Sequence, residues 1–291
     1  MKLLMKFNLV LVVFFGAGGF LIARLAYQFL TRNARDQVLQ QAELMMAGAR
    51  SMRDYTSEQI KPLLLKNPEH EINFLPQTVP AFAATTIFNS LRKSYPDYSY
   101  REATLNPTNL IDRAEDWEAD IVRYFADHSG EKKVVGERET PTGRYLYLAK
   151  PMSADASCLE CHSTPDVAPA AMLRTYGRQN GFGWKLNQII AAQIVSVPMA
   201  LPIQVADNAY RSLILFLVAT FLLSIAALDT ALYFIVIRPL RRASQAADRI
   251  SKGETDLPEL EVRGRDEIAD VTSSFNRMHV SLAKALKMLD Q

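Results

Sequence analysis

The sequence predicts a membrane protein of the α+β class with two transmembrane helices, and three observations carry this prediction. Two long apolar runs occupy residues 7–30 and 212–237, and each reaches the roughly 20 residues that a helix needs to cross hydrocarbon. Between them, residues 31–211 are mostly polar and mix helical with strand-like patterns, which suits one domain with its own core. After the second run, residues 238–291 carry the hydrophobic repeat of helices that pack side by side.

The charges beside the two apolar runs predict their orientation. Cations precede the first run and follow the second. They are Lys2 and Lys6 before the first run, and Arg238, Arg241, Arg242, Arg249 and Lys252 after the second. Cytoplasmic flanks of membrane spans are enriched in Lys and Arg. We therefore expect residues 1–6 and 238–291 in the cytoplasm and residues 31–211 outside it.

Two further features concern the apolar runs themselves. The small residues "GAGG" in the first run leave a cleaved signal peptide as an alternative, but the apolar stretch continues to Leu30 and favours an uncleaved anchor. Asp229 lies inside the second run, where an ionisable group marks a functional site by default. Because no basic residue is evident at the same depth, we expect a neutral Asp229 that is hydrogen-bonded within the helix bundle.

Both cysteines of the chain and one of its four histidines lie within "CLECH", residues 158–162. Two thiols alone would suffice for a disulfide or a redox pair, and zinc needs four ligands, for which the sequence has no second Cys-x-x-Cys or His pair. Covalent attachment of haem c requires the pattern Cys-x-x-Cys-His. Cys158 and Cys161 would then form thioethers with the haem vinyl groups, and His162 would bind the iron on its proximal side.

The surroundings of this motif favour one haem c over a thiol redox pair. A thioredoxin-like motif follows a strand and opens a helix, whereas here the polar "PMSADAS" precedes the motif and the Pro-rich "STPDVAPA" follows it. Haem c is attached outside the cytoplasm, which is where the flanking charges put residues 31–211. A thiol redox pair stays as the alternative.

The central segment reads as helices followed by antiparallel strands. Helical periodicity predicts helices over residues 35–66, 81–95 and 113–128, the first continuing from the first apolar run. Alternation around "PTG" predicts a hairpin over residues 132–152, and "QIVSVPM", residues 193–199, predicts a further strand. This order suggests an α+β sensor module.

Two amphipathic helices are predicted after the second apolar run. Gly253 and Pro258, in the connector "GETDLPELEVRGR", cannot continue a helix and separate the two. Each helix is too short to be stable alone, so we expect a homodimer that forms a parallel four-helix bundle. The apolar seams step by three and four residues: Leu240, Ala243, Ala247 and Ile250, then Ile268, Val271, Phe275, Met278, Leu282, Ala285 and Leu289.

This C-terminal segment resembles a HAMP domain. The resemblance rests on Pro239 just past the membrane, Gly253 at the end of the first helix, the connector, and Asp266-Glu267 opening the second helix. It implies a relay that passes motion from transmembrane helices to a cytoplasmic output. No kinase, cyclase or methyl-accepting segment follows, so the output is expected in a separate partner such as a kinase. A non-signalling remnant whose output was lost is the alternative.

The central segment resembles the Tll0287-like family, also called DUF3365, over roughly residues 35–205. Four stretches carry the resemblance in this order: "YSYREATLNPTNLIDRAEDWEADIVRYF", "YLAKPM", "CLECH" and "GFGWKLNQIIAAQIVSVPM". The resemblance implies a PAS-like fold and a haem c that responds to redox state or to a ligand in a membrane-anchored sensor. The fold expected from both readings is therefore an extracytoplasmic PAS-like α+β domain on two transmembrane helices with a cytoplasmic HAMP segment.

The second axial ligand of the haem iron does not follow from the resemblance. One family member uses a cysteine on the N-terminal helix, and this chain has no third cysteine. Soft or nitrogenous replacements are available, and water or an open site is a further alternative. We expect Met52, because "SMRDYT" occupies the part of the helix that faces the haem in the family. The other candidates are Met45, Met46, Met152, Met199, His70 and His128, of which His70 is expected to be solvated and His128 to interact with the end of a helix.

These observations predict a haem-c sensor in the inner membrane of a bacterium, with its sensor domain in the periplasm. It would transmit redox state or binding of NO, CO or O2 through the HAMP relay. An electron-transfer cytochrome anchored in the membrane is the alternative, and it explains "CLECH" but not the relay. We expect membrane lipid as a partner and no nucleic acid, since the net charge is only +2. We expect no enzyme, because no nucleophile–base–orienter set is evident.

Overall fold

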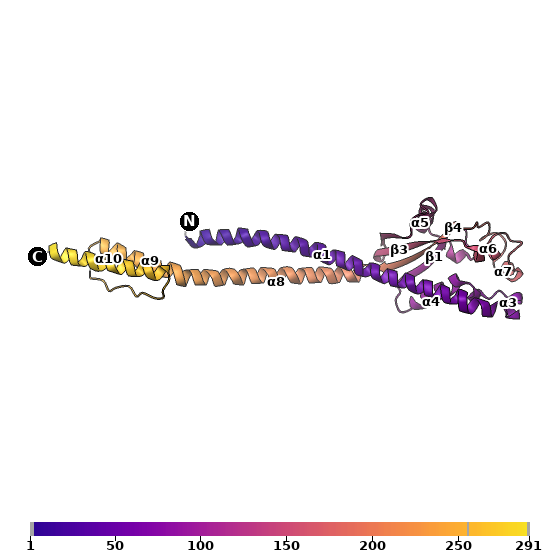
Figure 1. Ribbon diagram of the computed structural model, residues 1–291, viewed down its shortest axis with the longest axis horizontal. Coiled ribbons are helices and arrows are strands. Elements are labelled where there is room, and N and C mark those ends of the chain that lie inside the picture. The colour runs from indigo at the N-terminus through magenta and orange to yellow at the C-terminus, as the bar shows by residue number, and fades with distance from the viewer. Residues whose placement is uncertain (1–2, 255, 290–291) are drawn as a thin grey trace. The chain divides into compact units, whose positions relative to one another are not determined.

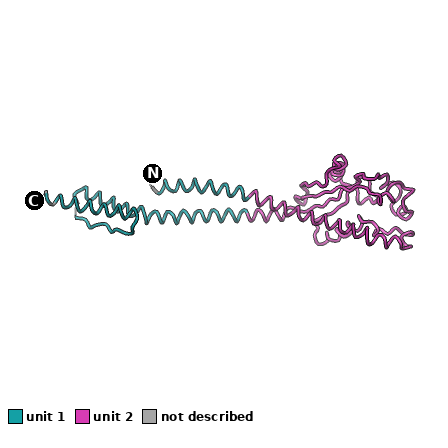
Figure 2. The backbone as a smooth tube through the Cα atoms, viewed as in Figure 1, with its two compact units in different colours: residues 1–26, 210–291 teal, residues 27–209 magenta. Residues whose placement is uncertain are grey.

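The computed structural model of the protein describes residues 3–254 and 256–289. It divides into two compact units, one of residues 27–209 and one of residues 1–26 with 210–291 (Figure 2). Lys2, one of the cations that predicted the orientation, lies outside the described residues, as does the side chain of Leu289. The two units are described separately below.

A four-stranded antiparallel sheet forms the centre of the unit of residues 27–209. Its strands are β1 (Ser99–Thr104), β2 (Val134–Thr140), β3 (Gly143–Ser153) and β4 (Ile189–Pro198), in the order β1-β4-β3-β2. The predicted hairpin is confirmed: β2 pairs with β3, and Thr140 lies opposite Gly143 across the turn. β4 lies between β1 and β3, so the last strand of the unit joins the first strand to the β2–β3 hairpin.

The two faces of this sheet are covered by different helices (Figure 1). On one face, α1 (Leu3–Tyr55) and α4 (Pro80–Leu91) pack on the sheet, and Val38, Met46 and Phe88 lie in a cluster with strand residues such as Leu148 and Val195. On the other face, α5 (Asp116–Asp127) buries Phe125 in a second cluster. A capping box between Glu115 and Glu118 starts α5, as expected from the charge near its N-terminus.

A buried polar network ties α1 to the sheet. Arg53 of α1 forms an ion pair with Glu102 of β1, whose carboxylate is almost fully buried. The hydroxyl of Tyr100 donates to Glu102 at 2.6 Å, and the amide of Gln193 on β4 donates to that hydroxyl at 3.0 Å. Burial and the neighbouring Glu102 raise the pKa of Tyr100, so it acts as a neutral donor.

The remaining elements of this unit are short. In chain order they are η1 (Thr56–Ile60), α2 (Lys61–Leu64), α3 (Pro68–Ile72), η2 (Pro76–Thr78), η3 (Leu110–Asp112), α6 (Ala156–His162) and α7 (Ala170–Tyr176). The three predicted helices of the central segment occur, the first of them running on from the first apolar run as expected. Strand β1 was not predicted, because Arg101 and Glu102 break the alternation of "SYREAT".

The second unit contains the two apolar runs. Residues 3–26 of α1 and residues 210–232 of α8 (Ala200–Leu232) carry them, and their most apolar stretches are exposed, as membrane-spanning helices would be. Asn8 donates a hydrogen bond of 2.9 Å to Asp229, and the rings of Phe15 and Phe221 lie 5.9 Å apart. The expected hydrogen bond of Asp229 to a neighbouring helix is therefore present. Two long apolar helices of this kind fit a membrane-anchored protein.

Helices α9 (Arg238–Ser251) and α10 (Glu267–Leu289) follow, as predicted, on either side of a non-helical connector. The side chain of Asn276 on α10 fixes this connector: its amide donates to the carbonyl of Leu260 at 2.8 Å, and its oxygen accepts from the N–H of Leu260 at 3.0 Å. Along the predicted seam of α10, Val271 is 49% exposed, Met278 58% and Leu282 42%. This apolar stripe is therefore left uncovered within one chain.

Two π-helical segments interrupt the long helices, and both precede a proline by two residues. η1 ends at Ile60, before Pro62, and η4 (Tyr233–Ile237) ends before Pro239. Proline has no N–H, and its ring clashes with the carbonyl four residues earlier, which belongs to Glu58 in η1 and to Ile235 in η4. A π turn widens the helix at that carbonyl and removes the clash.

Candidate haem-binding site

Helix α6 carries the "CLECH" motif and begins directly after β3. Asp155 caps it: the carboxylate accepts from the N–H of Cys158 at 3.1 Å and from the hydroxyl of Ser157 at 2.6 Å. These hydrogen bonds, that from Ser157 foremost, lower the pKa of Asp155 and keep it an anion at the N-terminus of the helix. The cap thus fixes the first turn, in which Cys158 lies.

Cys158 and Cys161 are free, half-buried thiols one helical turn apart. Cys158 packs with Met152 of β3 and Trp184 against a small cluster of Ala154, Ile190 and Ala191. Burial raises the pKa of both thiols, whereas a reactive redox cysteine needs a lowered pKa. Their position on one helix, with Cys158 against an apolar cluster, fits two thioether attachment points better than a redox pair.

His162 is held by hydrogen bonds and by stacking. Its Nδ1 lies 2.7 Å from the carbonyl oxygen of Gly181 and 3.3 Å from the hydroxyl of Thr108. Its ring stacks on Trp184, with centroids 4.1 Å apart and planes at 17°. A carbonyl oxygen can only accept, so Nδ1 carries the proton, and burial lowers the pKa of His162 and keeps the ring neutral.

This state of His162 is the one that binds a metal. With Nδ1 protonated, Nε2 keeps its lone pair free, and a carbonyl acceptor on the far nitrogen is the usual partner of a ligating imidazole. Cys158, Cys161 and His162 together therefore fit covalent haem with a proximal histidine. The residues 3–254 and 256–289 contain no cluster of three or more Cys, His, Asp or Glu side chains of the kind that zinc needs.

Gly181 is required where it stands. It has a φ of +81°, and a Cβ there would lie 2.8 Å from the backbone of Thr108. Two backbone bonds tie the following loop to α6: Gly183 N–H to the carbonyl of Ser163 at 2.9 Å, and Trp184 N–H to that of His162 at 3.2 Å. The loop of residues 177–184 thus positions the imidazole.

Sequence reasoning missed three residues of this site. Thr108 and Gly181 were not singled out, and the stacking of Trp184 on His162 was not predicted. The two hydrogen-bond partners of His162 are far from it in the sequence: Gly181 by 19 residues and Thr108 by 54. No local sequence pattern can reveal such contacts. The only local signal was the glycine pair of "GFGW", which marks backbone that other residues cannot adopt.

The candidates for the second axial ligand are separated by the fold. Met52 lies on α1, packs against the first core cluster and lines an apolar cavity of about 600 Å³ with Phe82 and Ile87. It does not share the small cluster that contains Cys158. Met46 and Met199 are buried core residues. Met52 thus remains a prediction.

The two histidine candidates have different outcomes. The expectation that His70 is solvated is wrong: it lies in α3, is 9% exposed, and accepts from the N–H of Leu75 at 3.3 Å. Its ring also packs 5.6 Å from Phe74, which buries it. His128 caps the end of α5 with Nδ1 2.9 Å from the carbonyl of Tyr124, as expected.

Comparisons with known proteins identify two domains in the chain. The family model described as Tll0287-like matches residues 31–198, and the model described as HAMP domain matches residues 232–284. No curated protein matches. Among solved structures, the crystal structure of the cyanobacterial heme-protein Tll0287 is similar, with 12% sequence identity, a TM-score of 0.43, and coverage of 55% of this chain and 94% of that one.

Both resemblances predicted from the sequence are confirmed. The Tll0287-like match covers more than half of the 291 residues and includes Thr108, Gly181, Trp184 and the whole "CLECH" motif. The second match includes α9, the connector and most of α10. The chain belongs to the Tll0287-like family and carries a HAMP domain after its second apolar helix.

Proposed function

We propose that the protein is a membrane-anchored haem-c sensor that signals through its HAMP domain. The observation that carries the proposal is the geometry of His162: Nδ1 is engaged by Gly181, and Nε2 is left to bind iron beside the two thiols of α6. A haem attached there would supply a redox-active iron that can also take NO, CO or O2. The Tll0287-like and HAMP domains are signalling, non-catalytic domains, and they suggest a sensor.

The fold supports a path from α6 to the second membrane helix. Cys158 packs near Ile190 and Ala191, which lie at the start of β4. β4 ends at Pro198, and α8 begins two residues later at Ala200. A change in packing around α6 would therefore displace a strand that continues directly into a membrane helix. Signalling also requires a two-state element that the ligand biases, and we propose the HAMP bundle for that role.

The HAMP domain supports a homodimer that reports to a separate partner. Val271, Met278 and Leu282 form an uncovered apolar stripe on α10, and a second copy would bury it in a four-helix bundle. We propose a cytoplasmic partner such as a kinase, residues 31–211 on the periplasmic side, and an inner-membrane location. The basic flanks of the apolar helices support this orientation.

The first prediction concerns attachment of the haem. Cys158→Ala with Cys161→Ala removes both thioether sulfurs, so we expect no haem on the chain after denaturing electrophoresis. Glu160→Gln is the control, because Glu160 is an exposed residue of the same helix and carries no thiol, and this variant should keep the stain for covalent haem. Full covalent haem in the double variant would contradict the haem-c assignment.

The second prediction concerns the positioning of His162. Gly181→Ala places a methyl group against Thr108, so the loop must move and its carbonyl must leave Nδ1. We expect an altered absorption spectrum with covalent attachment retained. Gly183→Ala is matched, since its φ is +83° but no atom lies within 4 Å of the added carbon. Strain of about 1 kcal/mol is common to both, so equal spectra for the two variants would mean that Gly181 does not position the ligand.

The third prediction concerns the second axial ligand. Met52→Leu removes the thioether sulfur while conserving most of the volume, so the absorption spectrum of the reduced protein should change if the sulfur binds iron. Met45→Leu, about two helix turns earlier on the same partly buried face, should leave the spectrum unchanged. An unchanged spectrum in Met52→Leu would exclude Met52 as the ligand.

The fourth prediction concerns the HAMP dimer. Phe275→Asp places a charge on the apolar seam of α10, at a cost of roughly 1–3 kcal/mol for each buried unpaired group. We expect it to abolish disulfide crosslinking between cysteines introduced at Val271 of the two copies. The haem spectrum should stay the same.

Ser274→Asp is the control for this change, because Ser274 is exposed and lies beside Arg277, whose guanidinium already donates to it at 2.8 Å. Crosslinking should persist in that variant. If crosslinking is absent without any substitution, or survives Phe275→Asp, the segment is not a dimeric relay and a membrane-anchored electron carrier becomes the better explanation.

A further inference from the structure

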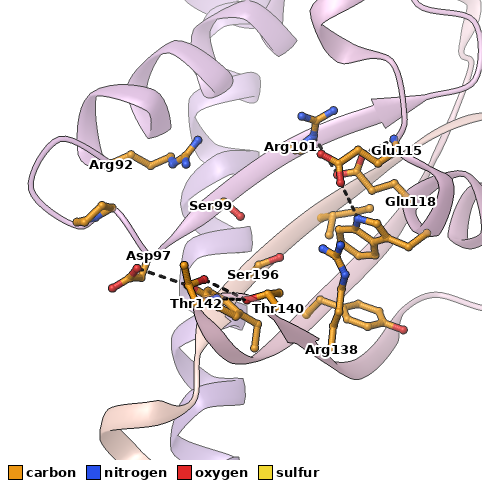
Figure 3. Close-up of a pocket in the computed structure, with 15 residues that line it drawn as sticks. Arg92, Asp97, Ser99, Arg101, Glu115, Glu118, Arg138, Thr140, Thr142 and Ser196 are labelled. Atoms are coloured by element: carbon orange, nitrogen blue, oxygen red, sulfur yellow. Dashed lines mark hydrogen bonds and ion pairs between the residues drawn. The ribbon is translucent and has the colours of Figure 1, made fainter.

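Helix α5 covers only part of the sheet face on which it packs. It packs on Ala103, Ala149 and Ala192, and its 12 residues do not reach the strand ends that carry Ser99 and Ser196. A cavity of about 370 Å³ lies there, between the sheet, the start of α5 and the end of α4 (Figure 3). Neither cysteine nor His162 lines it, so it is separate from the candidate haem site.

The floor of this cavity offers hydrogen-bonding groups that the protein does not use. Ser99 of β1 and Ser196 of β4 lie directly opposite each other in the sheet register. Within residues 3–254 and 256–289, neither hydroxyl takes part in a hydrogen bond. Tyr145, Tyr147 and Trp117 supply an aromatic wall. The floor of the cavity is thus polar and one wall is aromatic, a combination found in sites that bind small organic molecules.

Three guanidinium groups from three elements surround this floor, as Figure 3 shows: Arg92 at the end of α4, Arg101 on β1 and Arg138 on β2. Arg101 is paired with Glu118 at 2.9 Å. Arg138 stacks on Trp117, 4.4 Å from the ring centroid, and like Arg92 it forms no ion pair in the described part of the chain. Two cations of the cavity are therefore free to bind an anion.

No acidic group of the cavity forms an ion pair with Arg92 or Arg138 in the described part of the chain, although Glu118 lies near enough to Arg138 to interact with it electrostatically. Glu115 accepts from the indole N–H of Trp117 at 3.0 Å and caps α5, and Asp97 accepts from the hydroxyl of Tyr145 at 3.4 Å. Burial raises the pKa of Glu118, against the influence of Arg101. Both Glu115 and Asp97 face other partners, yet they lie near enough to disfavour a doubly charged phosphate.

We propose that this cavity binds a small organic carboxylate. Guanidinium groups bind carboxylates through paired, charge-assisted hydrogen bonds, which Arg92 and Arg138 can supply. The serine hydroxyls would bond to the ligand's polar end, and the tyrosine rings would pack on its carbon skeleton. Ser196 lies only four residues before α8 begins, so the ligand would contact the same strand that the haem-bearing helix contacts, at its opposite end. The protein then has a second input besides haem.

The test is calorimetry on the purified, haem-loaded full chain in detergent. The probes are the monocarboxylates acetate, propionate, butyrate and benzoate, with inorganic phosphate and neutral succinamide for comparison. We expect at least one carboxylate to bind with a Kd of about 1 mM or below, and Arg92→Gln or Arg138→Gln to weaken it about tenfold. Arg123→Gln is the matched control, because Arg123 lies on α5 outside the cavity, and it should have no effect.

Arg92 is exposed, so its replacement should leave the haem spectrum and the thermal transition unchanged. The proposal is overturned if none of the four carboxylates binds at about 10 mM, or if binding is indifferent to both arginine substitutions. Phosphate or succinamide binding as tightly as the best carboxylate would also overturn it. These outcomes do not depend on which residue is the second axial ligand.

Discussion

The ion pair between Arg53 and Glu102 is the contact on which the arrangement of residues 27–209 depends. Burying a charge without its partner costs about 3–5 kcal/mol, so α1 can pack only where Arg53 meets the buried carboxylate on β1. Through Tyr100 the same network reaches Gln193 on β4. The helix that arrives from the first apolar run and the strand that leaves toward the second are therefore fixed to each other.

The two faces of the sheet differ in how they are covered. One face is filled by α1 and α4 and serves as core, while the other is only partly covered by α5 and keeps a polar cavity. The haem motif packs near Ile190 at the start of β4, and the cavity has Ser196 near its end. These positions are about 20 Å apart along the strand, so under the two proposals one element would receive two unlike inputs.

The "CLECH" motif could be singled out from the sequence because its three groups are neighbours in the chain. The sequence also allowed the long helices and the β2–β3 hairpin to be predicted, since these have strong periodicity. Contacts that depend on tertiary packing were missed: Gly181 and Thr108 meet His162 only after folding, and Arg101 and Glu102 concealed β1. His70 was misjudged because the polar "NPEHE" suggests solvent, whereas Phe74 buries its ring.

The π-helical segment before Pro239 has a consequence for protein engineering. A π turn accommodates one additional residue, which shifts the helical phase by about 100°. The faces of α9 therefore cannot be deduced by counting a heptad repeat down α8 through residues 233–237. A chimaera that joins this sensor to a foreign output domain would keep its rotational register only if the junction lies beyond Pro239, so that the π turn and its proline are inherited together.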